Sequence, residues 1–244
     1  AQGFGYQTAF FVGGVIAAAA AILSFLFTDN THKPSTTDSN YIKTIGKIFR
    51  SNKRILSTAG SVALIFQFMR AVRQLLIPLF GVIVGLDAAT IGLIYALSAA
   101  VDMSMFYPVG VVMDRWGRKW TGMPSVLFFI IGFITLPLSQ GFYSLLLAGV
   151  LLGFANGLSV GLVQIIGMDL APMNARGEFL GIWRLISDAG WAAGPLLAGV
   201  LVDIASLSVV SFSTAGLGLF GGLIFLVMVP ETLKLSRDRI ANES

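Results

Sequence analysis

Long apolar stretches alternate with short polar connections along most of the chain. Seven stretches are long enough to cross a hydrocarbon core, which takes roughly 20 helical residues; they lie at 5–27, 56–84, 88–112, 121–139, 142–168, 179–202 and 208–229. A segment inside a bilayer must satisfy its own backbone hydrogen bonds, so each stretch is predicted to be a helix. The pattern therefore predicts an all-α, polytopic membrane protein with seven transmembrane helices.

Composition agrees with this class. The chain is 56% hydrophobic and only 11% charged, with a mean hydropathy of +0.84, whereas soluble domains are typically about 25% charged. The 244 residues include no cysteine, which excludes a disulfide framework and a thiolate metal site. We expect neither a metal nor a cofactor.

Basic residues are divided very unevenly between the connections. The connections 85–87, 140–141 and 203–207 contain no Lys or Arg. The connections and tail on the other side contain thirteen, which are Lys33, Lys43, Lys47, Arg50, Lys53, Arg54, Arg115, Arg118, Lys119, Arg176, Lys234, Arg237 and Arg239. The positive-inside rule then places the amino terminus outside and the carboxyl terminus in the cytoplasm of a cell membrane, plasma or inner. The pI of 9.6 thus reflects topology, and we expect no nucleic-acid partner.

A polar segment divides the chain. Residues 29–54 begin with linker composition and continue with an apolar stripe at helical spacing, formed by Tyr41, Ile42, Ile45, Ile48 and Phe49. The stripe predicts either a short amphipathic helix in the cytoplasmic interface or an extension of the next span. The predicted organisation is one span in 1–28, a cytoplasmic linker in 29–54, a six-helix bundle in 55–230 and a cytoplasmic tail in 231–244.

One charged hairpin lies between two of the apolar stretches. It reads Gly110-Val-Val-Met-Asp-Arg-Trp-Gly-Arg-Lys119, and this pattern resembles the signature loop of the major facilitator superfamily of solute transporters. Two further segments resemble family features: Asp169 is followed after six residues by Arg176-Gly177, and the last span ends in Pro230-Glu231-Thr232. An alternative interpretation is that the hairpin only anchors the topology.

The resemblance implies a carboxyl-terminal half of a transporter, preceded by the last helix of the other half. We expect the chain to be a piece of a longer protein, with a missing amino-terminal six-helix half and the lipid bilayer as its partners. The resemblance also implies a cytoplasmic gate in which acids and bases pair when helix ends approach. Its expected residues are Gly110, Asp114, Arg115, Gly117, Arg118, Lys119, Asp169, Arg176 and Gly177.

Three arginines remain inside predicted spans. A charge at the bilayer centre costs about 2.5–3.5 kcal/mol on insertion scales, so it persists where it faces protein or a water-filled cavity. We expect Arg184 to pair with Asp188, and Asp102 to pair with Arg70 or Arg73. The predicted substrate and proton pathway consists of Arg70, Arg73, Gln74, Asp102, Asn156, Arg184 and Asp188, with Gln164, Trp183 and Trp191 as further lining. The alternative is that these charges are structural ion pairs.

Small residues predict close helix packing. Gly149, Gly153, Gly157 and Gly161 recur every four residues, which predicts a continuous groove on one helix. A second seam contains Gly190, Gly194, Pro195 and Gly199, and Pro195 is expected to kink its helix.

The function implied by the resemblance is secondary active transport of a small organic solute by alternating access. The pattern is most similar to drug-efflux-type members, which implies proton-coupled export of amphipathic compounds; a sugar or organic-anion transporter remains an alternative. A seven-helix receptor is the rival class, since its topology is the same. We do not expect an enzyme: the hydrolase-like string at 157–161 lies in a predicted helix, and the histidine of the chain, His32, lies in the linker.

Overall fold

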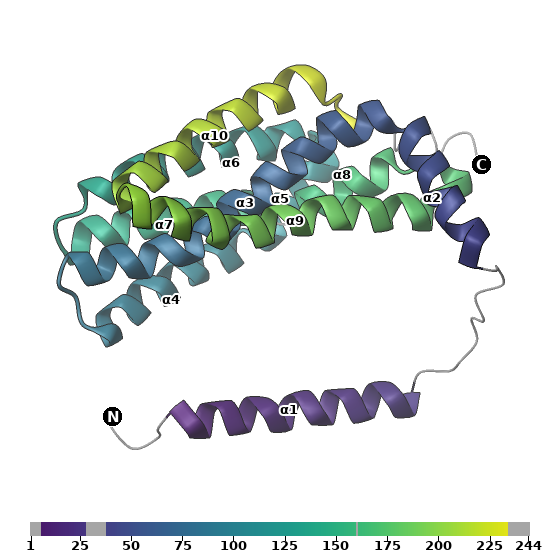
Figure 1. Cartoon of the computed structure of the whole chain (residues 1–244). Helices are drawn as coiled ribbons and strands as arrows, with labels where there is room; N and C mark the ends of the chain where they lie inside the picture. The colour runs from purple at the N-terminus through teal and green to yellow at the C-terminus, as the bar shows by residue number, and fades with distance from the viewer. Residues whose placement is uncertain (1–5, 28–37, 160, 234–244) are drawn as a thin grey trace. The chain divides into compact units, whose positions relative to one another are not determined.

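The computed structural model describes residues 6–27, 38–159 and 161–233, with side chains described in 11–24 and from 45 onward. All secondary structure in these ranges is helical (Figure 1). The elements are α1 (Tyr6–Phe27), α2 (Asp38–Ser51), α3 (Lys53–Ile83), α4 (Ala88–Ser104), α5 (Phe106–Arg115), α6 (Lys119–Thr135), η1 (Leu136–Leu138), α7 (Phe142–Leu158), α8 (Leu162–Leu170), η2 (Met173–Ala175), α9 (Arg176–Ile204) and α10 (Leu207–Met228). The predicted all-α class is therefore correct for the described residues.

The chain separates into two units, Ala1–Ile42 and Lys43–Ser244. In the second unit, six helical segments are long and apolar enough to cross a membrane: Lys53–Ile83, Ala88–Arg115, Lys119–Leu138, Phe142–Leu170, Met173–Ile204 and Leu207–Met228. In the first unit, α1 forms over 22 residues, but the apolar part with described side chains, Phe11–Ser24, is shorter than a span. Six of the seven expected spans thus have a counterpart here, and the seventh stays a prediction.

Two of the expected spans each consist of two helices. The span predicted at 88–112 consists of α4 and α5, which meet at Met105. Pro108 explains the break, because a proline ring clashes with the carbonyl group four residues earlier, here that of Ser104. The span predicted at 142–168 ends its first helix at Leu158, and α8 begins at Leu162. Gly161 has a φ of +71° there, a left-handed conformation that glycine adopts without steric cost.

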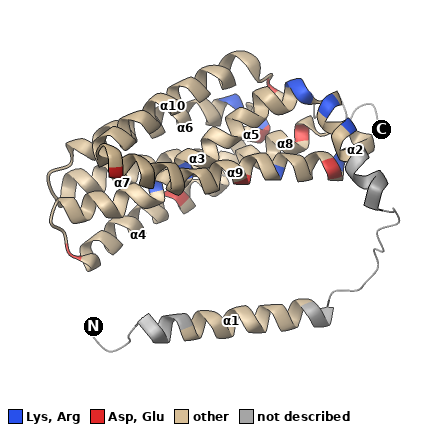
Figure 2. Cartoon of the chain, viewed as in Figure 1, with Lys and Arg blue, Asp and Glu red and all other residues tan. Residues whose placement is uncertain are grey.

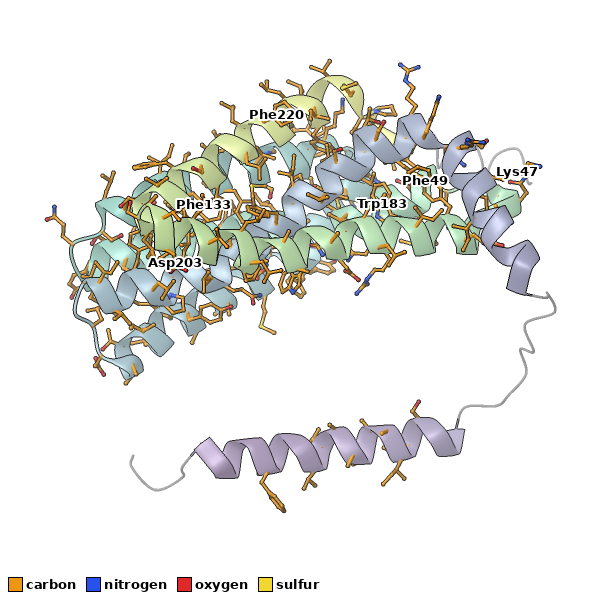
Figure 3. All side chains as sticks on the ribbon, viewed as in Figure 1. Lys47, Phe49, Phe133, Trp183, Asp203 and Phe220 are labelled. Atoms are coloured by element: carbon orange, nitrogen blue, oxygen red, sulfur yellow. The ribbon has the colours of Figure 1, made fainter. Side chains whose placement is uncertain are left out.

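The amphipathic stripe lies on a helix separate from the following span. Helix α2 ends at Ser51 and α3 begins at Lys53, with Asn52 between them outside helical geometry (φ −107°, ψ 19°). Near this junction Ile48 is buried, while Lys47, Phe49 and Arg50 are exposed; Figure 3 labels Lys47 and Phe49. A separate helix favours the interfacial alternative over a straight extension of the next span, although its place in a membrane stays a prediction.

The bundle is held together by close pairs of helices. Helix α3 packs against α9 and α10, while α7 packs against α4 and α6. The centre is filled by large apolar side chains with almost no exposure, including Phe66, Met69, Leu76, Phe129, Phe133 and Leu152. Burial of such side chains in a dense interior fixes the helix register.

Glycines make two of these approaches possible. A Cβ added at Gly153 or Gly157 would meet backbone atoms of Ser98 or Asp102 on α4, and one at Gly149 would lie 3.2 Å from Ile94. A Cβ added at Gly190 or Gly194 would meet the backbone of α3. These five glycines of the predicted seams thus lie where two helices approach closely.

The predicted seams are wrong at two other glycines. Gly161 lies in the break between α7 and α8 and not in the groove, and a Cβ at Gly199 would meet nothing within 4 Å. Helix α9 runs through Pro195 to Ile204 without ending, so the kink stays a prediction.

Burial is unequal among the six spans. Within the most apolar window of each, 11% of the Ala88–Arg115 residues and 22% of the Met173–Ile204 residues are buried, against 44–61% in the other four. Helices α4, α5 and α9 are therefore the least covered helices among the six spans.

A polar cap fixes the start of α4. The Asp87 carboxylate accepts hydrogen bonds from the Ala89 backbone N–H at 3.2 Å and from the Thr90 hydroxyl. The hydrogen bond from Thr90 lowers the pKa of Asp87, because it favours the charged form. The cap ends the four-residue connection between α3 and α4 with an ionised group at the start of α4.

Candidate functional site

Charged residues gather at one end of the six-helix unit, which includes the hairpin between α5 and α6 (Figure 2). Arg118 is at the centre. Its Nε donates to Asp169 Oδ2 at 3.0 Å, its Nη1 donates to the Met113 carbonyl at 2.7 Å, and Nη1 lies 3.6 Å from Asp114 Oδ1. Arg118 is 7% exposed and Asp169 is 9% exposed, whereas the Asp114 side chain is 75% exposed. Arg118 and Asp169 thus form the buried ion pair of this site.

The segment after α10 closes over this pair. The Glu231 carboxylate accepts hydrogen bonds from the backbone N–H groups of Arg118 at 2.8 Å and Lys119 at 3.1 Å. The Thr232 hydroxyl donates to Asp169 Oδ2 at 2.7 Å. An anion at the first N–H groups of a helix is favourable because these groups have no partner within the helix. We call Asp114, Arg118, Asp169, Glu231 and Thr232 the hairpin cluster.

The hairpin requires glycine at one of its positions. Gly117 has a φ of +114°, and an added Cβ would lie 2.6 Å from the Glu231 carboxyl carbon. At Gly110 and Gly177, by contrast, an added Cβ would meet nothing within 4 Å. Of the three glycines expected in the gate, Gly117 is the one with a steric reason to be glycine.

The other bases expected in the gate do not join the cluster. Lys119 donates from Nζ to the Leu226 carbonyl at 2.8 Å, which ties α6 to the end of α10. Arg115 and Arg176 are exposed, and neither is within ion-pair distance of a carboxylate in the described part of the chain. The hairpin and Asp169 are brought together as expected, but Arg176 is not paired with them.

A second polar group lies inside the bundle and connects three spans. Arg73 of α3 has its Nη1 3.5 Å from Asp102 Oδ2 of α4. The same Asp102 oxygen accepts a hydrogen bond from Asn156 Nδ2 of α7. Asn156 Oδ1 in turn accepts from Arg70 Nε at 2.7 Å, and Arg70 Nη1 donates to Gln67 Oε1 at 3.2 Å. We call these five residues and Ser98 the interior network.

Ser98 extends the network to the α4–α7 contact. Arg73 Nη2 donates to the Ser98 hydroxyl at 2.8 Å, and Ser98 donates to the Gly149 carbonyl. Of the polar side-chain atoms buried in the described residues, Arg73 Nε and Asp102 Oδ1 have no hydrogen-bond partner. The network holds two guanidinium groups and one carboxylate, so its formal charge is +1.

The remaining residues of the predicted pathway lie elsewhere. Arg184 Nε donates to Asp188 Oδ2 at 2.8 Å, which forms the expected pair, but the side chains are 70% and 50% exposed. Gln74 is exposed and lines a depression of about 240 Å³ with Trp191 and Pro195, not the interior network. The structure therefore joins Arg70, Arg73, Asp102 and Asn156 and separates them from the other three residues.

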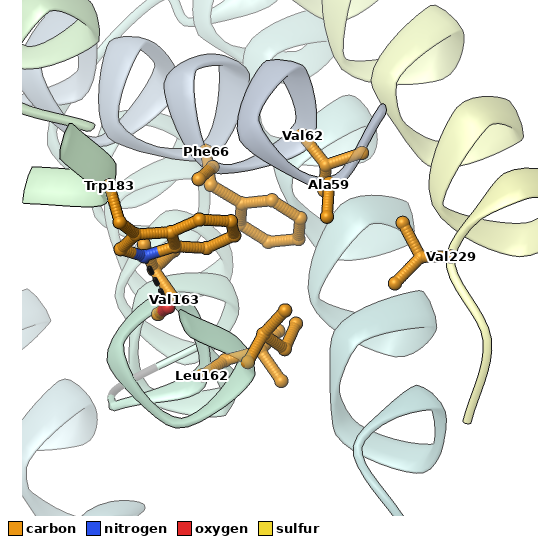
Figure 4. Close-up of a pocket in the computed structure, with 9 residues that line it drawn as sticks. Ala59, Val62, Phe66, Leu162, Val163, Trp183 and Val229 are labelled. Atoms are coloured by element: carbon orange, nitrogen blue, oxygen red, sulfur yellow. Dashed lines mark hydrogen bonds between the residues drawn. The ribbon is translucent and has the colours of Figure 1, made fainter. Parts of the chain in front are cut away.

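Trp183 belongs to an apolar site. Its side chain is 4% exposed, its Nε1–H donates to the Val163 carbonyl at 3.0 Å, and it lines a small apolar pocket with Phe66 and Leu162 (Figure 4). This pocket has space of about 10 Å³, roughly that of one water. Trp183 is thus a packing residue, and its expected place on the polar pathway is wrong.

Sequence reasoning did not assign a role to four residues that complete the two sites. Glu231 and Thr232 belong to the Pro230-Glu231-Thr232 exit, but the sequence does not predict that they bind the charged groups. Gln67 lies three residues before Arg70 and was given no role. Ser98 carried no signal at all. In the described residues, His, Cys, Asp and Glu form no group of three or more that could hold a metal ion.

The chain is similar to known transporters. A family model described as Major Facilitator Superfamily matches residues 62–244. Relatives include the MFS-type transporter gkaD of Penicillium citrinum, 33% identical over 107 residues, covering 43% of this chain and 18% of the relative. The MFS-type efflux transporter phmH of Phaeosphaeria nodorum is 29% identical over 128 residues, covering 52% and 22%.

A bacterial relative and a solved structure are also similar to this chain. The putative multidrug resistance protein MdtD of Yersinia pseudotuberculosis is 27% identical over 136 residues, covering 56% of this chain and 29% of the relative. A crystal structure of a POT family transporter in complex with a thioalcohol-conjugated peptide has a TM-score of 0.63 at 20% identity, covering 74% of this chain and 39% of that one. At this identity the likeness shows the fold alone.

The matches span less than a third of each of these three relatives, and the family model covers most of this chain. The chain belongs to the major facilitator superfamily.

Proposed function

We propose that this chain forms the carboxyl-terminal six-helix bundle of a secondary transporter that exports a small amphipathic solute in exchange for protons. Family membership supports membrane transport and favours it over a seven-helix receptor or an enzyme. The names of two relatives, an efflux transporter and a putative multidrug resistance protein, support the direction and the solute class. The observation that carries the proposal is the interior network, because charged groups within spans persist where a solute or ion pathway requires them.

Asp102 is the residue of the network best suited to exchange a proton. One of its oxygens, Oδ2, holds both Arg73 and Asn156, while Oδ1 is buried without a partner. Protonation would remove the charge that attracts Arg73 and weaken the hydrogen bond from Asn156. The contacts between α3, α4 and α7 at this level therefore depend on the protonation state of a single carboxyl group. Such a dependence couples proton binding to helix movement.

The arginines are suited to orient the solute. Arg70 uses its Nε and Nη1 on Asn156 and Gln67, and Nη2 has no acceptor in the described residues. The Arg70 residue is only partly buried. Its free donors can bind a carboxylate or another hydrogen-bond acceptor.

A second candidate function is transport of an organic anion. The formal charge of the interior network, +1, favours it, because a buried charge without a counterion is unfavourable and an anionic group on the solute would compensate it. The two candidates differ in the solute and share the pathway.

The hairpin cluster is proposed to be a cytoplasmic gate. Arg118 and Asp169 lie on the start of α6 and the end of α8, and the pair is lost when these helix ends separate. An exposed ion pair is worth about 0–1 kcal/mol, and charge-assisted hydrogen bonds in a buried setting are stronger. The cluster can therefore bias an equilibrium between closed and open states.

Proton release tests the role of Asp102. The full-length protein in detergent is titrated with ethidium, an amphipathic cation, at constant weak buffering, and released protons are followed with a pH indicator. We expect ethidium to release protons from the unmodified protein and to release few or none from Asp102→Asn. The matched control is Asp203→Asn, which removes an exposed acid at the end of α9 and should not change the release. Unchanged release from Asp102→Asn would remove Asp102 from the coupling mechanism.

A further inference from the structure

A groove opens at the end of the bundle where α3 begins and where α8 and α10 end. Its volume is about 330 Å³, and its lining includes Arg54, Ile55, Thr58, Leu170, Met228 and Pro230. Most of this lining is apolar, and Arg54, which is exposed, supplies its charge. We call it the Arg54 groove.

The segment that contains α2 and α3, beside the groove, carries cations without acids. Residues 39–86 contain no Asp or Glu. Lys47, Arg50, Lys53 and Arg54 are all exposed, and none is within ion-pair distance of a carboxylate in the part of the chain that the structure describes. Like charges so close together repel one another unless an anion lies among them.

The two acids next to the groove are already engaged. Asp169, beside Leu170, is bound by Arg118 and Thr232. Glu231, beside Pro230, accepts the backbone N–H groups of Arg118 and Lys119. Neither is available to neutralise Arg54, so no carboxylate of the described residues serves as its counterion.

We propose that the Arg54 groove binds an anionic phospholipid of the surrounding bilayer. Arginine binds phosphate oxygens with its planar set of N–H donors, and the apolar lining fits the glycerol backbone and the first acyl carbons. The Thr58 hydroxyl donates to the Arg54 carbonyl at 2.8 Å, so its proton is not available and Arg54 is the donor to the phosphate. A free phosphate ion would bind the Arg54 guanidinium but would make no contact with the apolar lining.

The neighbouring helix supports a lipid as the occupant. Next to the groove α2 exposes Lys47 and Arg50, and the Phe49 side chain is 49% exposed (Figure 3). Cations beside an exposed aromatic ring are typical of a helix at the surface of an anionic membrane. Basic clusters that flank membrane spans attract anionic headgroups with about 1 kcal/mol per cation. Each cation thus favours binding of an anionic lipid over a neutral one roughly fivefold.

The experiment compares lipids of different charge. The full-length protein, stripped of native lipid in detergent, receives dioleoyl-phosphatidylglycerol or dioleoyl-phosphatidylcholine, and bound lipid is counted by native mass spectrometry alongside thermal unfolding. We expect phosphatidylglycerol to bind more tightly and to raise the unfolding temperature. Arg54→Gln should reduce this preference roughly fivefold, and Arg54→Lys should retain most of it.

Two controls separate the groove from general electrostatics. Arg176→Gln removes an exposed, unpaired cation from the start of α9 and should leave the lipid preference unchanged. Inorganic phosphate alone should not reproduce the shift in unfolding temperature. Equal preference for phosphatidylglycerol in the unmodified protein and in Arg54→Gln would overturn the proposal, as would the same shift with phosphate. The readout is lipid binding and not transport, so its result is independent of the proposed transport function.

Discussion

Burial distinguishes the hairpin bases from one another. Arg115, Arg118 and Lys119 lie within five positions, and the sequence predicts all three as gate cations. The structure buries Arg118 alone, because it also has partners in distant segments: Asp169 lies 51 positions away and Glu231 lies 113 positions away. Local sequence shows that a cation belongs in the hairpin. The arrangement of the helices determines which of the three bases meets a buried carboxylate.

The acids of the hairpin cluster should differ in their effect on transport. Both Asp169→Asn and Asp114→Asn are expected to reduce solute flux in reconstituted vesicles of the full-length protein while leaving membrane insertion intact. The loss should be larger for Asp169→Asn, because Asp169 is buried and holds both Arg118 and Thr232, whereas the Asp114 side chain is 75% exposed. Asp203→Asn is the control. Normal flux in Asp169→Asn would remove the gate role of the cluster.

The two ion pairs inside spans should differ in stability. Asp102→Asn leaves the Arg73 side chain, 5% exposed, without its charge partner, and breaking a buried pair in this way costs about 3–5 kcal/mol. Asp188→Asn breaks a pair whose side chains are 70% and 50% exposed, which is worth about 0–1 kcal/mol. Thermal unfolding in detergent measures both. A similar decrease in the two unfolding temperatures would contradict the assignment of Arg73 and Asp102 as a buried pair.

At the scale of the elements, sequence and structure differ mainly at breaks within spans. The apolar pattern locates six spans but treats 88–112 and 142–168 as single helices. Both breaks have local causes in the sequence, Pro108 for one and Gly161 for the other, and neither changes the apolar pattern. A glycine repeat does not itself tell which member packs and which one turns: Gly149, Gly153 and Gly157 contact α4, while Gly161 takes the positive φ.

The hairpin between α5 and α6 should tolerate alanine at one glycine and not at another. Gly117→Ala combines a positive φ with a collision against Glu231, and such backbone strain costs about 1–3 kcal/mol. It should also displace Glu231 from the start of α6. Gly110→Ala places its Cβ in open space and should be neutral. The unfolding temperature and the solute flux measure the effect. If both are unchanged in Gly117→Ala, Glu231 can move without affecting stability or transport.

The α4–α7 contact should be equally sensitive to added volume. A Cβ at Gly153 would meet the Ser98 backbone and lie 2.8 Å from Ser98 Oγ, the hydroxyl that accepts from Arg73. Gly153→Ala should therefore separate the two helices and destabilise the protein by about 1–3 kcal/mol, as overpacking does in other cores. Gly199→Ala, with open space around the added atom, is the control within a helix. Equal stability of the two variants would mean that α4 is not held against α7.

At the scale of the whole molecule, the six spans cover one another unequally. Helices α4, α5 and α9 leave most of their residues uncovered, whereas α3 is buried along much of its length. The sequence could not predict this, because the mean hydropathy of the two least covered spans, 1.5, equals that of α3, which is the most buried span. The interior network lies where α3, α4 and α7 meet, so a second half placed against α4 and α9 would enclose a pathway beside it.

Cysteine labelling tests whether α4 and α9 face that pathway. The chain has no cysteine, so single cysteines at Met103 on α4 and Leu185 on α9 can be compared with one at Leu223 on α10; these side chains are 67%, 73% and 54% exposed. In the full-length protein, with any cysteine outside this chain replaced, alternating access would line α4 and α9 with water, where a hydrophilic maleimide reacts. A cysteine on α10 would face lipid and stay unreacted, because thiolate formation and the reagent both need water. Solute should change the labelling rate at Met103→Cys and Leu185→Cys and not at Leu223→Cys. Fast labelling at Leu223→Cys with none at the other two would place the second half against α10 instead.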